Sequence, residues 1–387
     1  MRTLIVTPSY LPIIGGSETL VRNLAKELNK SGIRTDVMTF NMTEKWKPAW
    51  NSTIERDGES TIYRIGALNP FVLLSMEPFY HPLRINVLPR PGFKQIISNY
   101  DIIHFLGEAD LSLIISCRAV KKPKIMHCVG VPGLEEQFRR HTILKKFFVK
   151  VFPNLAHLYI VFSPDERQVL IEMGVAPSKV LVLPYGIDTE FFRPDEGKRR
   201  ENLILFVGRI ETVKGVHILL RSLKYLKAKT EVVLIGPSSD PRYLREIDKM
   251  CLQVQNDGVH RVKYLGSLDQ HDLRAWYQSA TVLVRPDIVG ASGAGCSTME
   301  ALACGTPVVG VIDHVVEDEM NGLIVPPNNP KELGSALLRI MQDEELRARY
   351  GDEGRRMIEQ CYSLKSASTK LVNVYKSLLG HERTIGL

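Results

Sequence analysis

The chain has 387 residues, of which 44% are hydrophobic and 24% charged, and its formal net charge is +7. This composition is that of an ordinary globular protein, and the length favours two domains over one because a single core stops growing below this size. The six cysteines show no Cys-x-x-Cys spacing, which argues against a disulfide framework and against a zinc site.

The sequence favours a cytoplasmic protein. The apolar run after Met1 is too short for a signal peptide, and no uncharged stretch is long enough to span a bilayer. The whole charge excess lies in the first half, where residues 1–186 contain 23 Lys and Arg against 16 Asp and Glu. Such asymmetry is expected where one half meets an anionic partner, with a membrane surface or a nucleic acid as the usual candidates.

The first half begins with a strand, helix, strand pattern. We expect a buried strand at residues 4–7, a helix over residues 18–31 with its apolar residues on one face, and a strand at residues 35–40. Further strands are predicted at residues 102–105, 124–127, 159–162 and 179–183. This alternation is typical of a doubly wound parallel sheet.

The second half repeats the theme. A strand at residues 203–207, a loop at 208–215, a helix at 216–226 and a strand at 231–236 come first. Strands at residues 282–284 and 307–310 follow, and helices are expected beyond Lys331. The joint between the halves falls near Pro184–Asp188, so we predict an α/β protein with domains at residues 1–186 and 187–387.

The most informative stretch is residues 285–309. Its small-residue loop, Gly290–Gly295, leads into a helix that carries Glu300. A glycine-rich turn before a helix offers free backbone amides to an anion, and a carboxylate can accept hydrogen bonds from hydroxyl groups. The pattern indicates a site for a phosphate and a sugar.

Two cations follow the strand at residues 203–207. Arg209 and Lys214 lie in a loop at its carboxyl end, which is where open α/β sheets bind ligands. Such a pair suits a diphosphate that gains charge as it leaves. Spacing alone leaves open the alternative that both cations form ordinary surface ion pairs.

Several motifs in this order resemble one family. They are Gly15-Gly16-Ser17-Glu18, His127 after a strand, Ser163, residues 179–188 with Phe192 and Pro194, residues 206–209 with Lys214-Gly215, residues 262–266, and residues 300–309. Together they resemble the retaining nucleotide-sugar glycosyltransferases of the GT-B fold, in particular glycosyltransferase family 4. The match spans nearly the whole chain.

The resemblance implies two doubly wound Rossmann-like domains facing a cleft, with a last helix near residues 363–387 that returns to the first domain. It implies that a nucleoside diphosphate sugar, a UDP- or GDP-sugar first of all, is a substrate and that no cofactor is needed. The base would lie near Gly236, Leu265 and Gly266, and the ribose on Glu300. The diphosphate would lie between Arg209 and Lys214, so that transfer retains the anomeric configuration without a protein nucleophile.

The remaining site residues follow from the same resemblance. Glycine amides of Gly15, Gly16, Gly293 and Gly295, beside Ala294, would approach the phosphates and the sugar. His127 would hold the donor sugar through a hydrogen bond, although a histidine after a strand is often a core residue. Glu18 is an acceptor-side candidate that could equally complement its helix dipole.

The chain departs from the family at one position. Many members have a second Glu eight residues before the one that matches Glu300, and here Ser292 stands there. Asp287 is a candidate replacement, but its offset is wrong for a direct exchange. Recognition of the donor sugar is therefore open, whereas the nucleotide half of the site is retained.

The acceptor substrate is the part of the predicted reaction that the sequence defines least. Residues 138–152 form a basic, amphipathic pattern and residues 69–76 an apolar one, and either can be an exposed surface or an ordinary packed face. If exposed, they favour a lipid or lipid-linked sugar acceptor and peripheral attachment to the cytoplasmic face of the membrane. Otherwise a saccharide acceptor fits as well.

Other classes are less well supported. Metal-dependent glycosyltransferases usually carry an Asp-x-Asp pair, and this sequence has none. No Gly-x-Gly-x-x-Gly turn supports a dehydrogenase, and no module for nucleic-acid recognition is found. A non-catalytic subunit that binds a nucleotide sugar, and a GT-B epimerase or hydrolase, stay as alternatives.

Overall fold

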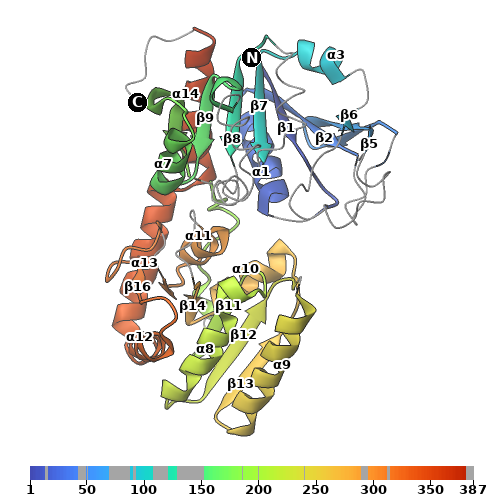
Figure 1. Cartoon of the computed structure of the whole chain (residues 1–387). Coiled ribbons are helices and arrows are strands. Elements are labelled where there is room, and N and C mark those ends of the chain that lie inside the picture. Colours follow the sequence, from blue (N-terminus) through green and yellow to red (C-terminus); the bar gives the residue numbers. More distant parts are fainter. Residues whose placement is uncertain are drawn as a thin grey trace. The chain divides into compact units, whose positions relative to one another are not determined.

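The computed structural model describes residues 1–13, 16–41, 49, 51–68, 88–89, 93–107, 121–128, 152–184, 186–198, 200–238, 240–288, 295–311 and 314–380. The chain divides into two compact units (Figure 1). The first unit is Met1–Gly186 with Leu364–Leu387, and the second unit is Ile187–Ser363. The chain therefore leaves the first unit once and returns to it with its last helix.

The first unit contains an eight-stranded sheet of order β10-β9-β8-β7-β1-β2-β4-β3. Its strands are β1 (Arg2–Thr7), β2 (Arg34–Phe40), β3 (Thr53–Asp57), β4 (Ser60–Ile65), β7 (Ile102–Gly107), β8 (Lys124–Cys128), β9 (Leu158–Val161) and β10 (Val180–Val182). All neighbours are parallel except β3 and β4. A separate antiparallel pair joins β5 (Ala67–Leu68) and β6 (Leu88–Pro89).

Helices cover both faces of this sheet. The helices α1 (Gly16–Lys30) and α14 (Leu364–Leu378) pack on one face, and α3 (Phe93–Ser98) and α7 (Pro164–Glu172) belong to the clusters of the other. Leu20, Val21, Leu24 and Leu28 of α1 are buried, so the apolar stripe read from the sequence does face the core. Ser163 caps α7 by accepting a hydrogen bond from the Glu166 amide at 3.2 Å.

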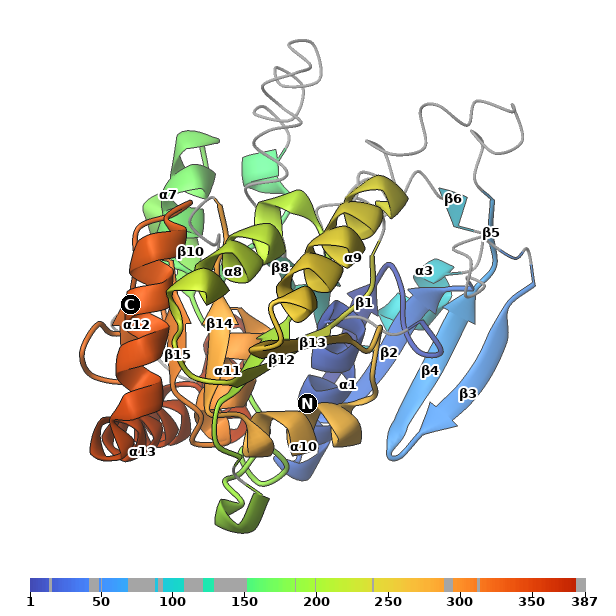
Figure 2. The same cartoon turned by 90° about the horizontal axis from the view of Figure 1, so that it is seen from below.

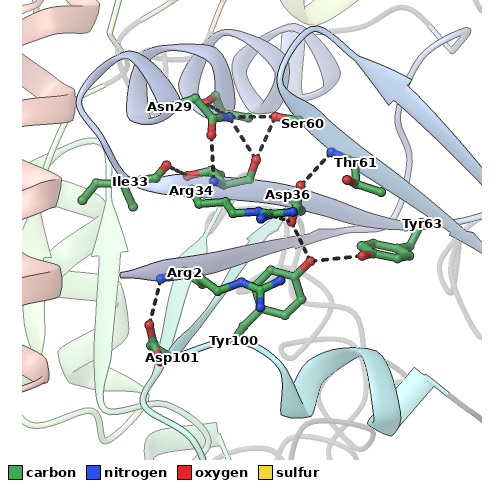
Figure 3. A network of polar contacts seen from close by, with 12 residues as sticks. Arg2, Asn29, Ile33, Arg34, Asp36, Ser60, Thr61, Tyr63, Tyr100 and Asp101 are labelled. Atoms are coloured by element: carbon green, nitrogen blue, oxygen red, sulfur yellow. Dashed lines mark hydrogen bonds and ion pairs between the residues drawn. The ribbon is translucent and has the colours of Figure 1, made fainter.

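A buried carboxylate ties the amino-terminal side of this sheet together (Figure 3). Asp36 on β2 accepts hydrogen bonds from the Tyr100 hydroxyl at 2.7 Å and from the Thr61 amide at 2.7 Å. The Arg2 guanidinium lies over the Tyr100 ring, 5.2 Å from its centroid. Because parallel strands bind ligands at their carboxyl ends, this network at the opposite side stabilises the unit without forming part of the ligand edge.

The second unit contains a parallel six-stranded sheet of order β13-β12-β11-β14-β15-β16. The strands are β11 (Leu203–Val207), β12 (Thr230–Ile235), β13 (His260–Tyr264), β14 (Val282–Arg285), β15 (Val308–Gly310) and β16 (Gly322–Ile324). The helices are α8 (Val216–Ser222), α9 (Pro241–Asn256), α10 (Gln270–Ser279), α11 (Cys296–Ala303), α12 (Pro330–Gln342) and α13 (Glu344–Cys361).

The helices of the second unit form two layers. Buried residues of α8, α9 and α12 share one core with the sheet, and Figure 2 shows α8 and α9 on one side of the strands and α10 and α11 on the other. The helix predicted over residues 216–226 is shorter than expected, because α8 ends at Ser222 and a 3₁₀ turn, Leu223–Tyr225, follows. Among the described residues, no helix has both the length and the apolar character needed to cross a bilayer.

Candidate functional site

Three strands of the second unit end in glycines at the carboxyl edge of the sheet. Gly208, Gly236 and Gly266 follow β11, β12 and β13, which are neighbours. Gly236 has a φ of +139°, its amide donates to the Gly266 carbonyl at 2.8 Å, and a Cβ on it would lie 2.1 Å from the Gly208 carbonyl oxygen. Only glycine permits this close packing of loops. Leu265 beside Gly266 is exposed at the same edge.

The predicted cations lie at the point where the strand order reverses. The chain enters this sheet at β11 and later places β12 on one side of it and β14 on the other, so the loops after β11 and β14 lie at the switch point, which is where such sheets bind ligands. Arg209 is largely exposed, and its Nη1 lies 2.9 Å from Glu211 Oε1. Lys214 is partly exposed, and its Nζ lies 2.7 Å from Asp287 Oδ1.

Asp287 connects Lys214 to the start of α11. Its Oδ2 lies 3.2 Å from Arg285 Nη2, and Arg285 Nη1 donates to Thr298 Oγ1 in α11 at 3.0 Å. A Cβ on Gly295 would lie 1.9 Å from the same Nη1, so the guanidinium packs directly against the glycine that precedes α11. Both Asp287 oxygens are thus engaged by cations, which favours a role in placing Lys214 over one in replacing the missing sugar-binding Glu.

Glu300 lies on α11 and accepts a hydrogen bond at Oε2 from the Tyr277 hydroxyl at 2.8 Å. Burial raises the pKa of the Glu300 carboxyl to about 7, and the hydrogen bond from Tyr277 opposes the rise. Gly295 precedes the helix and has no side chain that could cap the first-turn amides. The helix α11 therefore begins at a residue without a capping side chain and carries, one turn further on, a carboxylate whose pKa is raised to about 7.

In the first unit, Gly16 and Glu18 lie in the first turn of α1. Gly16 is exposed, whereas Glu18 is buried and accepts hydrogen bonds from the Ser9 hydroxyl, which follows β1, and from the Ser17 hydroxyl at 3.4 Å. The loop after β1 is at the switch point of this sheet, between β1 and β7. Glu18 therefore links the loop after β1 to the start of α1, and its role on the acceptor side stays a prediction.

His127 lies within β8 and points into the core. Its ring stacks on His104 with centroids 5.4 Å apart and packs on Phe162 at 4.8 Å. The side chain is 4% exposed, and neither ring nitrogen has a hydrogen-bond partner among the described residues. Burial holds the pKa of His127 well below its ordinary value. This environment favours a structural role, and a contact with the donor sugar stays a prediction.

The structure brings most of the predicted donor residues of the second unit to one sheet edge. Gly15, Ser292, Gly293 and Ala294 lie outside the described residues. Two further residues, Tyr277 and Arg285, belong to the site by their contacts with Glu300 and Asp287, and sequence patterns did not assign them a role. Within the described part of the chain, no group of three or more His, Cys, Asp or Glu side chains could hold a metal ion.

This edge of an α/β protein combines cations, a helix start and a carboxylate, a set of groups that suits a phosphorylated ligand. Comparison with known proteins gives the class. The model of the glycosyl transferases group 1 matches residues 188–357, and that of glycosyltransferase family 4 matches residues 14–191. The chain belongs to this family of glycosyltransferases and has the GT-B fold.

Several relatives and solved structures match over almost the full length. The O-antigen chain mannosyltransferase C of Escherichia coli is 24% identical, with 98% of this chain and 99% of the relative covered. Sucrose-phosphate synthase from Thermosynechococcus elongatus has a TM-score of 0.77 at 21% identity, with 99% of this chain and 100% of that chain covered. Anabaena HepE, solved in complex with UDP-glucose, has a TM-score of 0.74 at 17% identity over 97% of this chain and 100% of that chain.

Proposed function

We propose that this glycosyltransferase moves a hexose from a UDP- or GDP-sugar to a saccharide, lipid or lipid-linked acceptor, with retention of the anomeric configuration. The observation that carries the proposal is the carboxyl edge of the second sheet. There Lys214 is held at the sheet edge by Asp287, and Glu300 lies on the helix whose N-cap residue, Gly295, has no capping side chain. Cations and helix amides suit a diphosphate, and a carboxylate suits ribose hydroxyls.

The chemistry follows from these charges. As the sugar leaves, negative charge grows on the diphosphate, and Arg209 and Lys214 stabilise it most at the transition state. The departing phosphate oxygen accepts the proton of the attacking hydroxyl on the same face of the sugar, so the mechanism needs no protein nucleophile. Product analysis by NMR tests retention, because the anomeric coupling of the product distinguishes the two outcomes.

We propose that the reaction needs no divalent metal. The sequence has no Asp-x-Asp pair, and the two cations can supply the charge stabilisation that a metal ion would give. Transfer should continue at an unchanged rate in excess EDTA. Loss of transfer in EDTA and its return with Mg²⁺ or Mn²⁺ would contradict this part.

Lys214→Ala tests the catalytic assignment. We expect it to lower kcat/KM for transfer about 100-fold or more, since a charge aimed at the transition state is removed. Lys263→Ala is the matched control, because Lys263 forms an exposed ion pair with Glu231 at 2.7 Å in the same unit. Equal turnover in the two variants would contradict the role of Lys214.

A thermal-shift panel tests the donor class. UDP, GDP, ADP and their sugars, mannose included because the E. coli relative is named a mannosyltransferase, should be compared at equal concentration. Binding with transfer supports the proposal. Binding without turnover on any acceptor would favour a non-catalytic subunit, and consumption of donor without acceptor would favour an epimerase or hydrolase.

We propose a cytoplasmic location with attachment to an anionic membrane surface. The support is the charge excess of residues 1–186. Of the two segments that suggest a lipid surface, residues 69–76 and 138–151 lie outside the described residues, and Phe152 at the end of the second segment is buried. Flotation with anionic and neutral vesicles at low and high salt tests the idea, with duplex DNA as the competing anion. Preference for DNA over vesicles would contradict it.

A further inference from the structure

The buried hydroxyl of Tyr277 forms a hydrogen bond with Glu300, and this bond offsets the cost of burying it. Tyr277 lies on α10 and is fully buried, yet its hydroxyl must hydrogen-bond because burying a free one costs free energy. It donates to Glu300 Oε2 at 2.8 Å, which joins α10 to α11. A hydrogen bond to a charged acceptor is stronger than one between neutral groups.

The backbone and the ring of Tyr277 are each held by a further contact. The Thr306 hydroxyl donates to the Tyr277 carbonyl at 2.6 Å, and the Phe192 ring meets the Tyr277 ring at an interplanar angle of 70° with centroids 6.1 Å apart. Thr306 and Phe192 are themselves buried. The position of the hydroxyl is therefore set by the packing of the core, so it can hold a partner in one orientation.

In this arrangement only one of the two Glu300 carboxylate oxygens accepts a hydrogen bond from the described residues. One carboxylate oxygen accepts from Tyr277, and the described residues provide no hydrogen-bond partner for Oε1. The geometry points to Tyr277 as a positioning residue that orients the Glu300 carboxylate, so that its other oxygen accepts hydrogen bonds from the 2′ and 3′ hydroxyls of the nucleotide ribose. The inference rests on the proposed function, in which Glu300 binds the ribose. It adds that the preference for a ribose is set in part by a residue that does not touch the ligand.

The test compares nucleotides with and without these hydroxyls. The dissociation constants of UDP and of 2′,3′-dideoxy-UDP, or the GDP pair, are measured by calorimetry for each variant. We expect the wild type to prefer the ribonucleotide at least about tenfold, the size of one good hydrogen bond to a charged group. Tyr277→Phe should lower the preference to about threefold or less, and Glu300→Gln should bring it close to one.

Tyr350→Phe is the matched control. The Tyr350 hydroxyl donates to Glu319 Oε2 at 2.7 Å, so this variant removes the same kind of bond near the start of β16, at the amino side of the sheet. It should leave the ribose preference unchanged. If Tyr277→Phe does not fold, Phe192→Leu is the second variant, since it keeps the hydroxyl but loosens the ring, and an intermediate preference is expected.

The possible outcomes distinguish the binding of ribose by Glu300 from the orientation of Glu300 by Tyr277. A wild-type preference near one contradicts the binding of ribose by Glu300 and with it the inference. A tenfold preference in the wild type that persists in a folded Tyr277→Phe protein contradicts the inference alone. A preference lost equally in Tyr277→Phe and Tyr350→Phe shows a general effect of destabilisation and also overturns it.

Discussion

The carboxylate of Asp287 is shared by two cations from different loops. Lys214 follows β11 and Arg285 ends β14, so Asp287 links the loop after β11 to the end of β14. A buried carboxylate of this kind, like the buried Arg285 guanidinium beside it, is stable only while it is paired. The ammonium group of Lys214 is therefore placed before any ligand binds.

We predict that Asp287→Asn lowers kcat/KM about tenfold to 100-fold, because the amide cannot balance two positive charges and Lys214 loses its anchor. Steady-state kinetics with the donor identified by the panel provide the measurement. Asp352→Asn, on the exposed side of α13, is the control and should have no effect. Wild-type kinetics for folded Asp287→Asn would show that Lys214 is placed by other means.

Nucleotide binding should depend on pH through Glu300, whose pKa is raised to about 7. The ionised carboxylate accepts hydrogen bonds from hydroxyls better than the protonated one, so affinity rises as pH rises through 7. We expect binding of the nucleoside diphosphate to be about tenfold weaker at pH 6 than at pH 8. Calorimetry across this range gives the profile, and Glu300→Gln should show a flatter one. An identical profile in that variant would assign the titration to another group.

At the residue scale, the sequence supplied the candidate charged groups at the sheet edge but not the residues that contact and orient them. Arg209 and Lys214 follow the end of a strand, and Glu300 lies in a helix that follows a glycine-rich stretch, and such positions can be read from local pattern. Tyr277 lies 23 residues before Glu300 and reads as one more core residue of a helix. Its contact depends on how two helices pack, which no local spacing encodes.

At the scale of elements, the loop after β12 can accept no side chain at Gly236. A Cβ there would collide with the Gly208 backbone, and the φ of +139° is unfavourable for other residues. We predict that Gly236→Ala lowers the free energy of unfolding by about 3 kcal/mol or more, through strain and overpacking. Gly258 has a φ of +69°, and no atom lies within 4 Å of a Cβ added to it. Gly258→Ala should therefore lower the free energy of unfolding by only about 1 kcal/mol.

Urea unfolding of the two glycine variants measures this difference. Binding of the nucleoside diphosphate by Gly236→Ala should also weaken, because the adjoining loops after β11 and β13 must move. Equal stability in the two variants would mean that the loops at this edge relax freely.

Strands were predictable where they are buried on both faces. The strand β11 occupies the predicted residues, since its apolar run is bounded by polar residues before it and by Gly208 after it. The hairpin of β3 and β4 lies outside the predicted elements because β3 is exposed and carries charges such as Glu55 and Arg56. The dipeptide Asp57-Gly58 at its turn is the signal that could have found it.

At the scale of the whole molecule, a buried polar cluster connects the ends of the first unit. His104 on β7 shares a hydrogen bond of 2.6 Å with the Tyr375 hydroxyl on α14, and His127 stacks on His104. Burial lowers the pKa of His104 to about 3 and holds that of His127 well below its ordinary value. Both imidazoles are therefore neutral in the folded chain at physiological pH.

This cluster should make the fold sensitive to acid. The unfolded chain binds protons at these histidines below about pH 6.5 while the folded chain does not, so stability is present above that pH and is lost as the pH falls toward the folded values. Each histidine contributes about 1.4 kcal/mol per pH unit in this window. Urea unfolding between pH 7.5 and 5 measures the slope.

His127→Leu should reduce the acid slope, whereas His271→Asn, at an exposed position of α10, should leave it unchanged. The same His127 variant decides between the two roles of this residue. Transfer that persists in the folded variant supports the structural role, and transfer that is lost supports the contact with the donor sugar expected from sequence.

The class of fold followed from chain length and from the repeated strand, helix, strand order, both of which are properties of long segments. The acceptor did not follow, since it depends on surface groups of the first half whose patterns fit a packed helix equally well. Charge could be summed from the sequence, but its distribution over a surface depends on tertiary packing.

The first unit is discontinuous in sequence, whereas the second unit is one uninterrupted segment. Ile187 and Ser363, which begin and end the second unit, form a β-bridge, so the chain enters and leaves that unit at neighbouring points. A ribosome therefore completes the second unit before α14 exists. Until Tyr375 is synthesised, His104 lacks its hydrogen-bond partner. The first unit therefore cannot complete its folding until the end of the chain has been made, although its synthesis begins first.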